Sequence, residues 1–304
     1  MSEESREPIR TREEFSAATM GSIVDLNESH AIWMDRIFGK ALDAVVDRLA
    51  AVQEIVHLAG DDPEWEKMPT HLRDVVWISH EAVNGTMAAY QLVRHGYWQE
   101  SLVLVRHLIE VVSLMLHLCV EPNIREDFAS GKWRITKSIG PATKIIPPIG
   151  HMYGHLSNHA HPLYEFLVGK SGLARERTDE RLTYSIGGGM HREKEFFFRH
   201  AIRDILGVGM MLHAVCEYAF RHKVKDFRFW RVDGEQLGWH PTGAEQAKMK
   251  AMADFGSAED SLLPEQQYQD LGQFRVKYAK RHRLIYEAME DIERRRAEQP
   301  DRKA

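Results

Sequence analysis

A narrow stripe of polar side chains that could bind an anion or move a proton follows one strongly apolar segment, residues 98–119. On a helical wheel of 3.6 residues per turn, the stripe consists of Gln99, Arg106, Glu110, Ser113 and His117. Arg106 can pair with Glu110, one turn away, and still donate hydrogen bonds to an anion. A stripe that faces a cavity needs such pairing, since an isolated buried charge costs several kcal/mol. A stripe that faces solvent is the ordinary polar face of an amphipathic helix, and the sequence leaves both interpretations open.

A second stripe lies further along the chain and brings a phenol, a hydroxyl and an imidazole to one helix face. Tyr153, Ser157 and His161 are spaced at i, i+4 and i+8. His161 falls at the expected C-terminal end of this helix, where the helix dipole favours a protonated imidazole. An ordinary helix end with a satisfied histidine is the alternative. The two stripes together give the candidate catalytic residues Arg106, Glu110, Tyr153, Ser157 and His161.

One hypothesis, which rests mainly on the family resemblance given below, is that these five residues act on a phosphate ester. Arg106 would bind and neutralise the phosphate, and His161 would act as general acid or base near neutral pH. Ser157 and Tyr153 would orient the phosphate or a ribose hydroxyl.

A basic and aromatic segment near residue 228 predicts a contact with nucleic acid. Bases can stack on aromatic rings beside cations that bind phosphates. A solvated helix end with its aromatic side chains packed on the bundle is the alternative. The candidate nucleic-acid-binding residues are Lys223, Lys225, Arg228, Trp230 and Arg231.

Histidine is abundant, with 17 residues, but the spacing does not predict a metal site. His151, His155 and His159 share one helix face, yet a metal would need further ligands from elsewhere. A di-iron bundle would need two Glu-x-x-His motifs, and only Glu54–His57 fits. We therefore expect neither a metal nor a cofactor.

The elements that must position these residues are helices. The chain has 304 residues, 43% of them hydrophobic, and only 11 prolines, which favours an all-α fold with a sizeable core. Apolar residues at helical spacing, with Gly and Pro between the segments, predict the element bounds. We expect long helices over 28–58, 70–94, 98–119, 192–221 and 265–296, shorter ones over 124–138, 148–159 and 244–255, and an exposed loop or small hairpin over 169–190.

The composition also predicts three regions along the chain and argues against two classes of protein. We expect a flexible tail over 1–26, an α-helical bundle over 27–224, and a helical appendage with a frayed end over 225–304. The net charge of −5 argues against a DNA-coating protein. The charged start, and charged residues within the most apolar stretches, predict a cytoplasmic protein without a membrane span.

Two motifs resemble a family of bacterial all-helical proteins of unknown function. They are the run GYWQESLVLVRHLIEVVSLMLHL and the later YGHLSNHAHP, with an intervening Trp that fits Trp133. The family carries an Arg-x-x-x-Glu helix and a Tyr-x-x-Leu-Ser-x-x-x-His segment, and it is similar to the HEPN superfamily of helical bundles. The resemblance covers roughly residues 70–220. It implies a HEPN-like helical bundle with a C-terminal helical appendage.

Many HEPN proteins are metal-independent ribonucleases of phage defence or toxin systems, so the resemblance implies RNA or a nucleotide as partner. Their usual Arg-x(4–6)-His motif occurs only as Arg73–His80 and Arg275–His282, away from the expected helix. One alternative is a non-catalytic binding or oligomerisation module with a buried polar network, whose appendage docks a second copy or a partner. A metal-dependent helical-bundle enzyme is the third. We expect a homo-oligomer in either of the first two cases.

Overall fold

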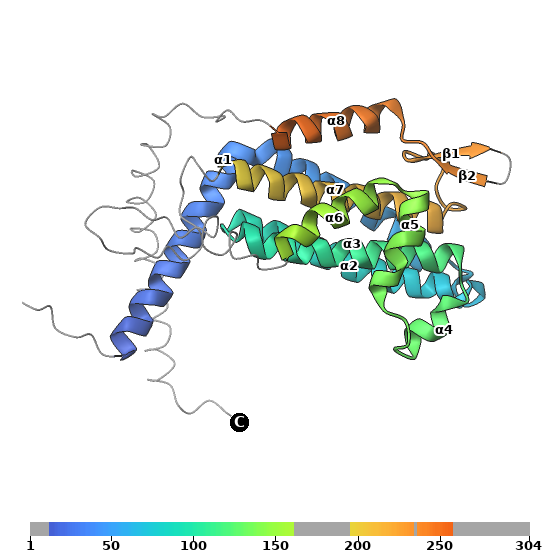
Figure 1. Cartoon of the computed structure of the whole chain (residues 1–304), viewed down its shortest axis with the longest axis horizontal. Helices are drawn as coiled ribbons and strands as arrows, with labels where there is room; N and C mark the ends of the chain where they lie inside the picture. The colour runs from blue at the N-terminus through green and yellow to red at the C-terminus, as the bar shows by residue number, and fades with distance from the viewer. Residues whose placement is uncertain (1–11, 161–194, 234–235, 258–304) are drawn as a thin grey trace, which may run out of the picture.

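The chain folds into a bundle of long helices, seen in a computed structural model that describes residues 12–160, 195–233 and 236–257 (Figure 1). Helices α1, α2, α3 and α7 form the body of the bundle, and α5 and α6 pack against α3. The described residues are mostly helical, with two short strands, in line with the expected all-α class. The helices are α1 (Arg12–Gly60), α2 (Thr70–Arg94), α3 (Trp98–Val120), α4 (Ile124–Ala129), α5 (Ile139–Ile145), α6 (Pro148–Ala160), α7 (Glu195–Ala219) and α8 (Gly243–Ser257), with 3-10 turns η1 (Trp65–Lys67) and η2 (Ile135–Ser138).

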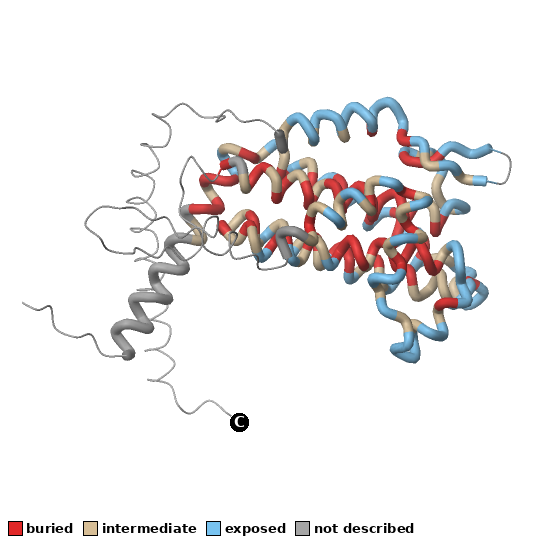
Figure 2. The backbone as a smooth tube through the Cα atoms, viewed as in Figure 1, coloured by how far each residue is buried: buried red, intermediate tan, exposed pale blue. Residues whose placement is uncertain are grey.

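The core lies where α3 meets α1, α2 and α7, and Figure 2 shows the buried backbone concentrated there. α3 has helices on most of its sides, because α2, α7, α6 and α5 all pack against it. This placement explains why nearly every residue of α3 is apolar. By length and composition α3 is the one described helix that could cross a membrane, but most of it is buried inside the bundle, as in the core helix of many proteins.

A tight connection places α2 and α3 side by side as an antiparallel hairpin. Gly96, between the two helices, has a φ of 94°, which a glycine adopts without steric cost. The two helices approach closely at Gly85, where an added Cβ would lie 2.8 Å from a methyl carbon of Leu108. The predicted bounds of α2 and α3 are confirmed to within a residue.

The structure corrects three of the predicted elements. The helix expected over 124–138 ends at Ala129, shortly before Gly131 with its φ of 73°, and residues 135–138 form the 3-10 turn η2. α1 begins at Arg12 rather than near residue 28, so the predicted flexible tail over 1–26 is wrong from Arg12 onward. The segment after residue 224, expected to be helical apart from breaks, contains a hairpin of strands β1 (Trp230–Asp233) and β2 (Gln236–Trp239). The strands are antiparallel, with Trp230 paired to Trp239. The predicted loop over 169–190 and helix over 265–296 lie outside the described residues.

The C-terminal appendage is packed on the bundle in its described part. Phe229 and Trp230 belong to the main hydrophobic core, and α8 runs back along α7 (Figure 1). The ring of Phe255 in α8 meets that of Phe38 in α1, with centroids 6.0 Å apart. Residues 225–257 therefore complete one face of the bundle, so the expected boundary at 224 does not separate two cores.

Candidate functional site

The structure brings together four of the five residues predicted to form a catalytic site. Arg106 of α3 donates hydrogen bonds to the hydroxyl of Tyr153, at 2.9 Å from Nη2, and to that of Ser157, at 3.3 Å from Nε. The same Nη2 lies 3.4 Å from a carboxylate oxygen of Glu110. His161, the fifth residue, lies outside the described residues. The residues that the spacing places on one face of α3 and on one face of α6 thus lie together in the structure.

The guanidinium of Arg106 is oriented on several sides yet stays accessible. Its side chain is 25% exposed and that of Glu110 is 12% exposed. The Cζ atom of Arg106 lies 5.1 Å from the ring centroid of Tyr153, a cation–π contact. Within the described part of the chain, the hydrogen bonds of Arg106 come from Nε and Nη2, and Nη1 donates none. We call Arg106, Glu110, Tyr153 and Ser157 the Arg106 site.

Ser113 and His117, in the C-terminal half of the polar stripe on α3, face the interior rather than solvent. Ser113 is buried, and its hydroxyl donates to the carbonyl of Ile109, within its own helix. His117 is also buried, with Nδ1 3.2 Å from the hydroxyl of Ser138 and Nε2 3.4 Å from Glu121. The interpretation of the stripe as a solvent face is therefore wrong. Its members serve different sites: Arg106 donates hydrogen bonds to α6, whereas His117 contacts Ser138 at the end of η2.

The basic and aromatic segment near residue 228 does not present its tryptophan to a ligand. Trp230 is 4% exposed, and its indole N–H donates to the carbonyl of Ala214 at 2.7 Å. Its prediction as a residue that stacks on a base is wrong, because the ring packs in the core beside Tyr218 and Trp239. The alternative weighed for this segment, aromatic side chains packed on the bundle, is the one observed.

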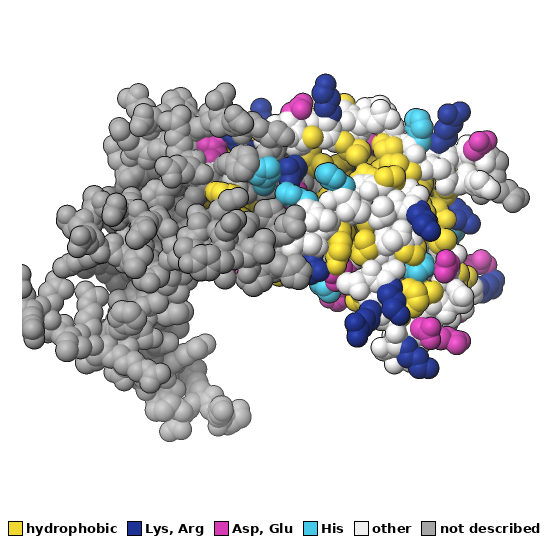
Figure 3. All heavy atoms as spheres, in the orientation of Figure 1, with side chains coloured by type: hydrophobic (Ala, Val, Ile, Leu, Met, Phe, Trp, Pro, Cys, Tyr) yellow, Lys and Arg dark blue, Asp and Glu magenta, His cyan; other side chains and the backbone are white. Residues whose placement is uncertain are grey.

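The cations of this segment are partly committed to ion pairs. Lys223 lies 2.7 Å from Asp62, and Arg228 lies 4.0 Å from Glu245. Lys225 and Arg231 are exposed. On the face shown in Figure 3, the Lys and Arg side chains are interspersed with Asp and Glu and form no continuous basic surface. The segment therefore offers separate charges rather than a track for a phosphate backbone.

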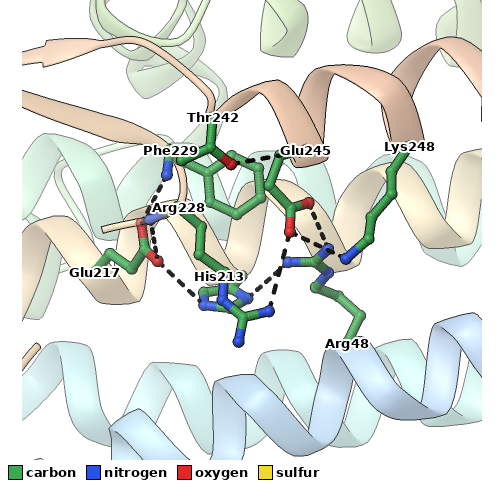
Figure 4. A network of polar contacts seen from close by, with 8 residues as sticks. All are labelled: Arg48, His213, Glu217, Arg228, Phe229, Thr242, Glu245 and Lys248. Atoms are coloured by element: carbon green, nitrogen blue, oxygen red, sulfur yellow. Dashed lines mark hydrogen bonds and ion pairs between the residues drawn. The ribbon is translucent and has the colours of Figure 1, made fainter. Parts of the chain in front are cut away.

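A buried ionic network that the sequence did not predict ties the appendage to the bundle (Figure 4). Arg48 of α1 donates to Glu245 of α8 at 2.6 Å, and its Nη1 lies 2.9 Å from Nδ1 of His213 in α7. The other ring nitrogen of His213 lies 3.3 Å from a carboxylate oxygen of Glu217. All four side chains are at most 5% exposed. We call these four residues the Arg48 network.

Arg48 determines which ring nitrogen of His213 carries the proton. Arg48 can only donate, so Nδ1 of His213 must accept and its proton sits on Nε2, facing Glu217. Glu217 also accepts the backbone N–H groups of Arg228, at 3.0 Å, and Phe229, at 3.1 Å. Both ring nitrogens of His213 are thereby engaged, so this histidine has no free nitrogen for acid–base chemistry. The network serves to hold the start of β1 and α8 in place.

Two carboxylates, Glu245 of the Arg48 network and Asp204 of α7, have lowered pKa values. Burial would raise the pKa of Glu245, but the charge and hydrogen bond of Arg48 and the contact with Lys248 outweigh it and lower the pKa below its ordinary value. Asp204 in α7 is also buried, which would raise its pKa. Its interactions with His155 and Arg203 lower that pKa instead.

The sequence contains one weak indication of the Arg48 network. His213 and Glu217 are spaced at i, i+4 in a stretch of α7 that is otherwise almost entirely apolar. Polar residues there must be buried and paired. Their partners could not be found from the sequence, because Arg48 lies 165 residues from His213 and 197 from Glu245.

The histidines weighed as metal ligands do not form a metal centre within the described residues. His151 is exposed, and Nε2 of His155 lies 3.6 Å from Asp204 and 3.2 Å from Arg203. His159 has a side chain outside the described set, and Glu54 and His57 are both exposed. Across residues 12–160, 195–233 and 236–257, no group of three or more His, Cys, Asp or Glu side chains is placed to hold an ion.

Comparison of the chain with protein-family models, with curated proteins and with solved structures finds no match. The resemblance to a HEPN-like family drawn from the motifs therefore stays a prediction, and the case for function has to be made from the side chains themselves.

Proposed function

We propose that the protein binds the phosphate of RNA or of a nucleotide at the Arg106 site and acts on the phosphate ester without a metal ion. The observation that carries the proposal is the state of Arg106. Its guanidinium is fixed by two hydroxyls of α6 and a carboxylate of α3, yet it remains a quarter exposed, and Nη1 donates no hydrogen bond to the described residues. A guanidinium fixed in this way is well suited to bind a phosphate oxygen.

Each residue has a role that follows from its contacts. Arg106 would bind the phosphate and neutralise the charge that develops on it in the transition state. Tyr153 and Ser157 would place a phosphate or ribose oxygen, since their hydroxyls can donate as well as accept. Glu110 holds the guanidinium in place. His161, four residues after Ser157 in the sequence, would transfer the proton.

The motif resemblance gives this proposal its substrate class. Four of the residues that carry the resemblance, Arg106, Glu110, Tyr153 and Ser157, form the Arg106 site, and the HEPN-like bundles that the motifs resemble include metal-independent ribonucleases. Cytoplasmic location and assembly as a homo-oligomer belong to the same proposal.

A second candidate function is a non-catalytic binding or oligomerisation module. The observation that favours it is that the same contacts of Arg106 join α3 to α6, so the network could serve only to fix one helix on the other. In that case removal of the arginine would lower stability without removing an activity.

The decisive experiment is cleavage of total bacterial RNA by the purified full-length protein in the presence of a chelator. The variants are Arg106→Ala, Arg106→Lys and His161→Ala. Arg125→Ala is the matched control, because Arg125 is also an arginine paired with a carboxylate, Asp74, and its side chain is 34% exposed. Circular dichroism of each variant checks the fold.

The proposal expects cleavage by the wild type and by Arg125→Ala, with a loss of about a hundredfold or more in Arg106→Ala. His161→Ala should lose cleavage as well. Arg106→Lys should lose most of it, since an ammonium lacks the planar fork of donors. Folded wild-type protein that neither cleaves RNA nor binds RNA or mononucleotides would refute the proposal and leave the non-catalytic module.

A further inference from the structure

A cavity of about 410 Å³ lies between α1, α7 and α8, apart from the Arg106 site. Short side chains cause the hollow: α1 lines it with Ala41, Ala44 and Ala51, and α8 with Ala251. A methyl group fills little of the space between two helices, so the gap stays open although the helices are packed together. Its volume falls in the range of small-molecule sites.

The wall of the cavity is largely apolar. α7 supplies Ile202, Leu206 and Met210, and α8 supplies Met252 and Phe255. The methionines are flexible and can adapt their shape to a guest. A ligand must therefore bring an apolar portion, because burial of this wall against a hydrated polar molecule would gain nothing.

The remaining lining residues are almost all cationic. One carboxylate, Asp47, stands among five cations: Lys40, Arg48, Arg203, Arg228 and Lys248. Acidic neighbours offset part of this charge. Arg48 and Lys248 share Glu245, and Arg203 pairs with Asp204.

Some positive charge is nevertheless left over. Lys40 is exposed and has no ion-pair partner among the described residues, and Arg228 is held only loosely by Glu245, at 4.0 Å. Arg48, 5% exposed, uses two of its five N–H groups in the contacts with His213 and Glu245. Counted together, the five cations and the carboxylates Asp47, Glu245 and Asp204 leave an excess of two positive charges, so the cavity suits an anionic head group.

We infer that the cavity binds a small amphipathic monoanion, a carboxylate on an alkyl chain. Its chain packs among the alanines and methionines of α1, α7 and α8, and its carboxylate meets the cations that line the same cavity. The ligand contacts the bundle and α8 at once, so its binding also stabilises the docking of α8. This site does not depend on the function proposed for the Arg106 site.

The test measures binding to the full-length protein by calorimetry and thermal unfolding, with decanoate as the probe. Decanol carries the same tail without the charge, acetate the head without the tail, and decyl phosphate a more highly charged head. We expect one decanoate per chain, a raised Tm, and a Kd at least about tenfold lower than for decanol. Acetate should not bind measurably.

Two matched pairs of variants locate the site. Ala44→Phe fills the cavity and should abolish decanoate binding, whereas Ala50→Phe, at an exposed position of the same helix, should not. Lys40→Glu should weaken decanoate about tenfold. Lys250→Glu, an exposed lysine of α8 outside the cavity, makes the same charge change and should leave the Kd unchanged.

Three results would overturn the inference. Equal affinity for decanol and decanoate would show that the cations do not contribute to binding. Unchanged binding in both Ala44→Phe and Lys40→Glu would place the ligand elsewhere, and Lys40→Glu keeps this test valid even if Ala44→Phe folds poorly. Tighter binding of decyl phosphate than of decanoate would refute the carboxylate head.

Discussion

Replacement of Glu217 by glutamine tests the Arg48 network at the point where it holds the appendage. The carboxylate of Glu217 is 1% exposed, accepts the backbone N–H groups of Arg228 and Phe229, and lies 3.3 Å from Nε2 of His213. Glutamine has nearly the same shape but only one acceptor oxygen. Its amide N–H₂ must therefore point at one of these donors, and that donor loses its partner in a buried place.

The cost can be worked out from these contacts. Loss of one hydrogen bond to a charged acceptor costs about 1.5–3 kcal/mol, and the donor left buried without a partner adds to it. We expect a decrease of about 3 kcal/mol in the free energy of unfolding, within the range found when one partner of a buried pair is removed. For a chain of this size that corresponds to a fall of roughly 5–10 °C in Tm.

Urea unfolding followed by circular dichroism and tryptophan fluorescence measures the loss. Glu81→Gln is the matched control, because Glu81 is an exposed glutamate in the middle of α2 and the same change there should stay within about 0.5 kcal/mol. Hydrogen exchange adds a local readout: the amides of Arg228 and Phe229 should exchange faster in Glu217→Gln, while those in α3 should not. If Glu217→Gln unfolds like the wild type, or the two variants lose the same stability, the role assigned to Glu217 is wrong.

Two further predictions concern packing and pH. Gly85→Ala should lower stability by about 1–3 kcal/mol because its Cβ would lie 2.8 Å from Leu108, whereas Gly39→Ala, with open space around it, should raise stability by up to about 1 kcal/mol. Thermal unfolding of the pair decides this, and an equal effect of both changes would contradict it. Asp204 and Glu245 have pKa values below their ordinary 3.8 and 4.5, so their stabilisation is complete above about pH 4.5 and is lost as pH falls through and below these values. Urea titrations at fixed pH should show a shallower acid decline for Asp204→Asn than for the wild type, and an unchanged decline would argue against an ionised, stabilising Asp204.

The helices were predictable because their signals are local. Apolar spacing identified α2, α3, α6 and α7, and glycine or proline marked their ends, as Gly96 does between α2 and α3. The same spacing placed Tyr153 and Ser157 on one face of α6. Once α6 packs on α3, that face meets Arg106, so this part of the Arg106 site could be predicted.

Local patterns failed where one pattern fits two environments. The short hairpin after residue 229 was missed because its aromatic residues stand among charges and glycines, without a clear alternation. Trp230 shows the same difficulty. An aromatic ring beside cations fits a nucleic-acid surface as well as a core, and only the position of the hairpin against α7 puts it in the core.

The sequence by itself determined the helical class, most element bounds and which polar residues share a helix face, because these depend on neighbours within a few turns. Tertiary structure alone decided whether the polar stripe of α3 is buried. It also decided that Arg48 pairs with Glu245 across 197 residues and that alanines leave a cavity under α8. Charge pairing and cavities depend on which helix faces pack together in the folded bundle, and local sequence patterns do not specify that packing.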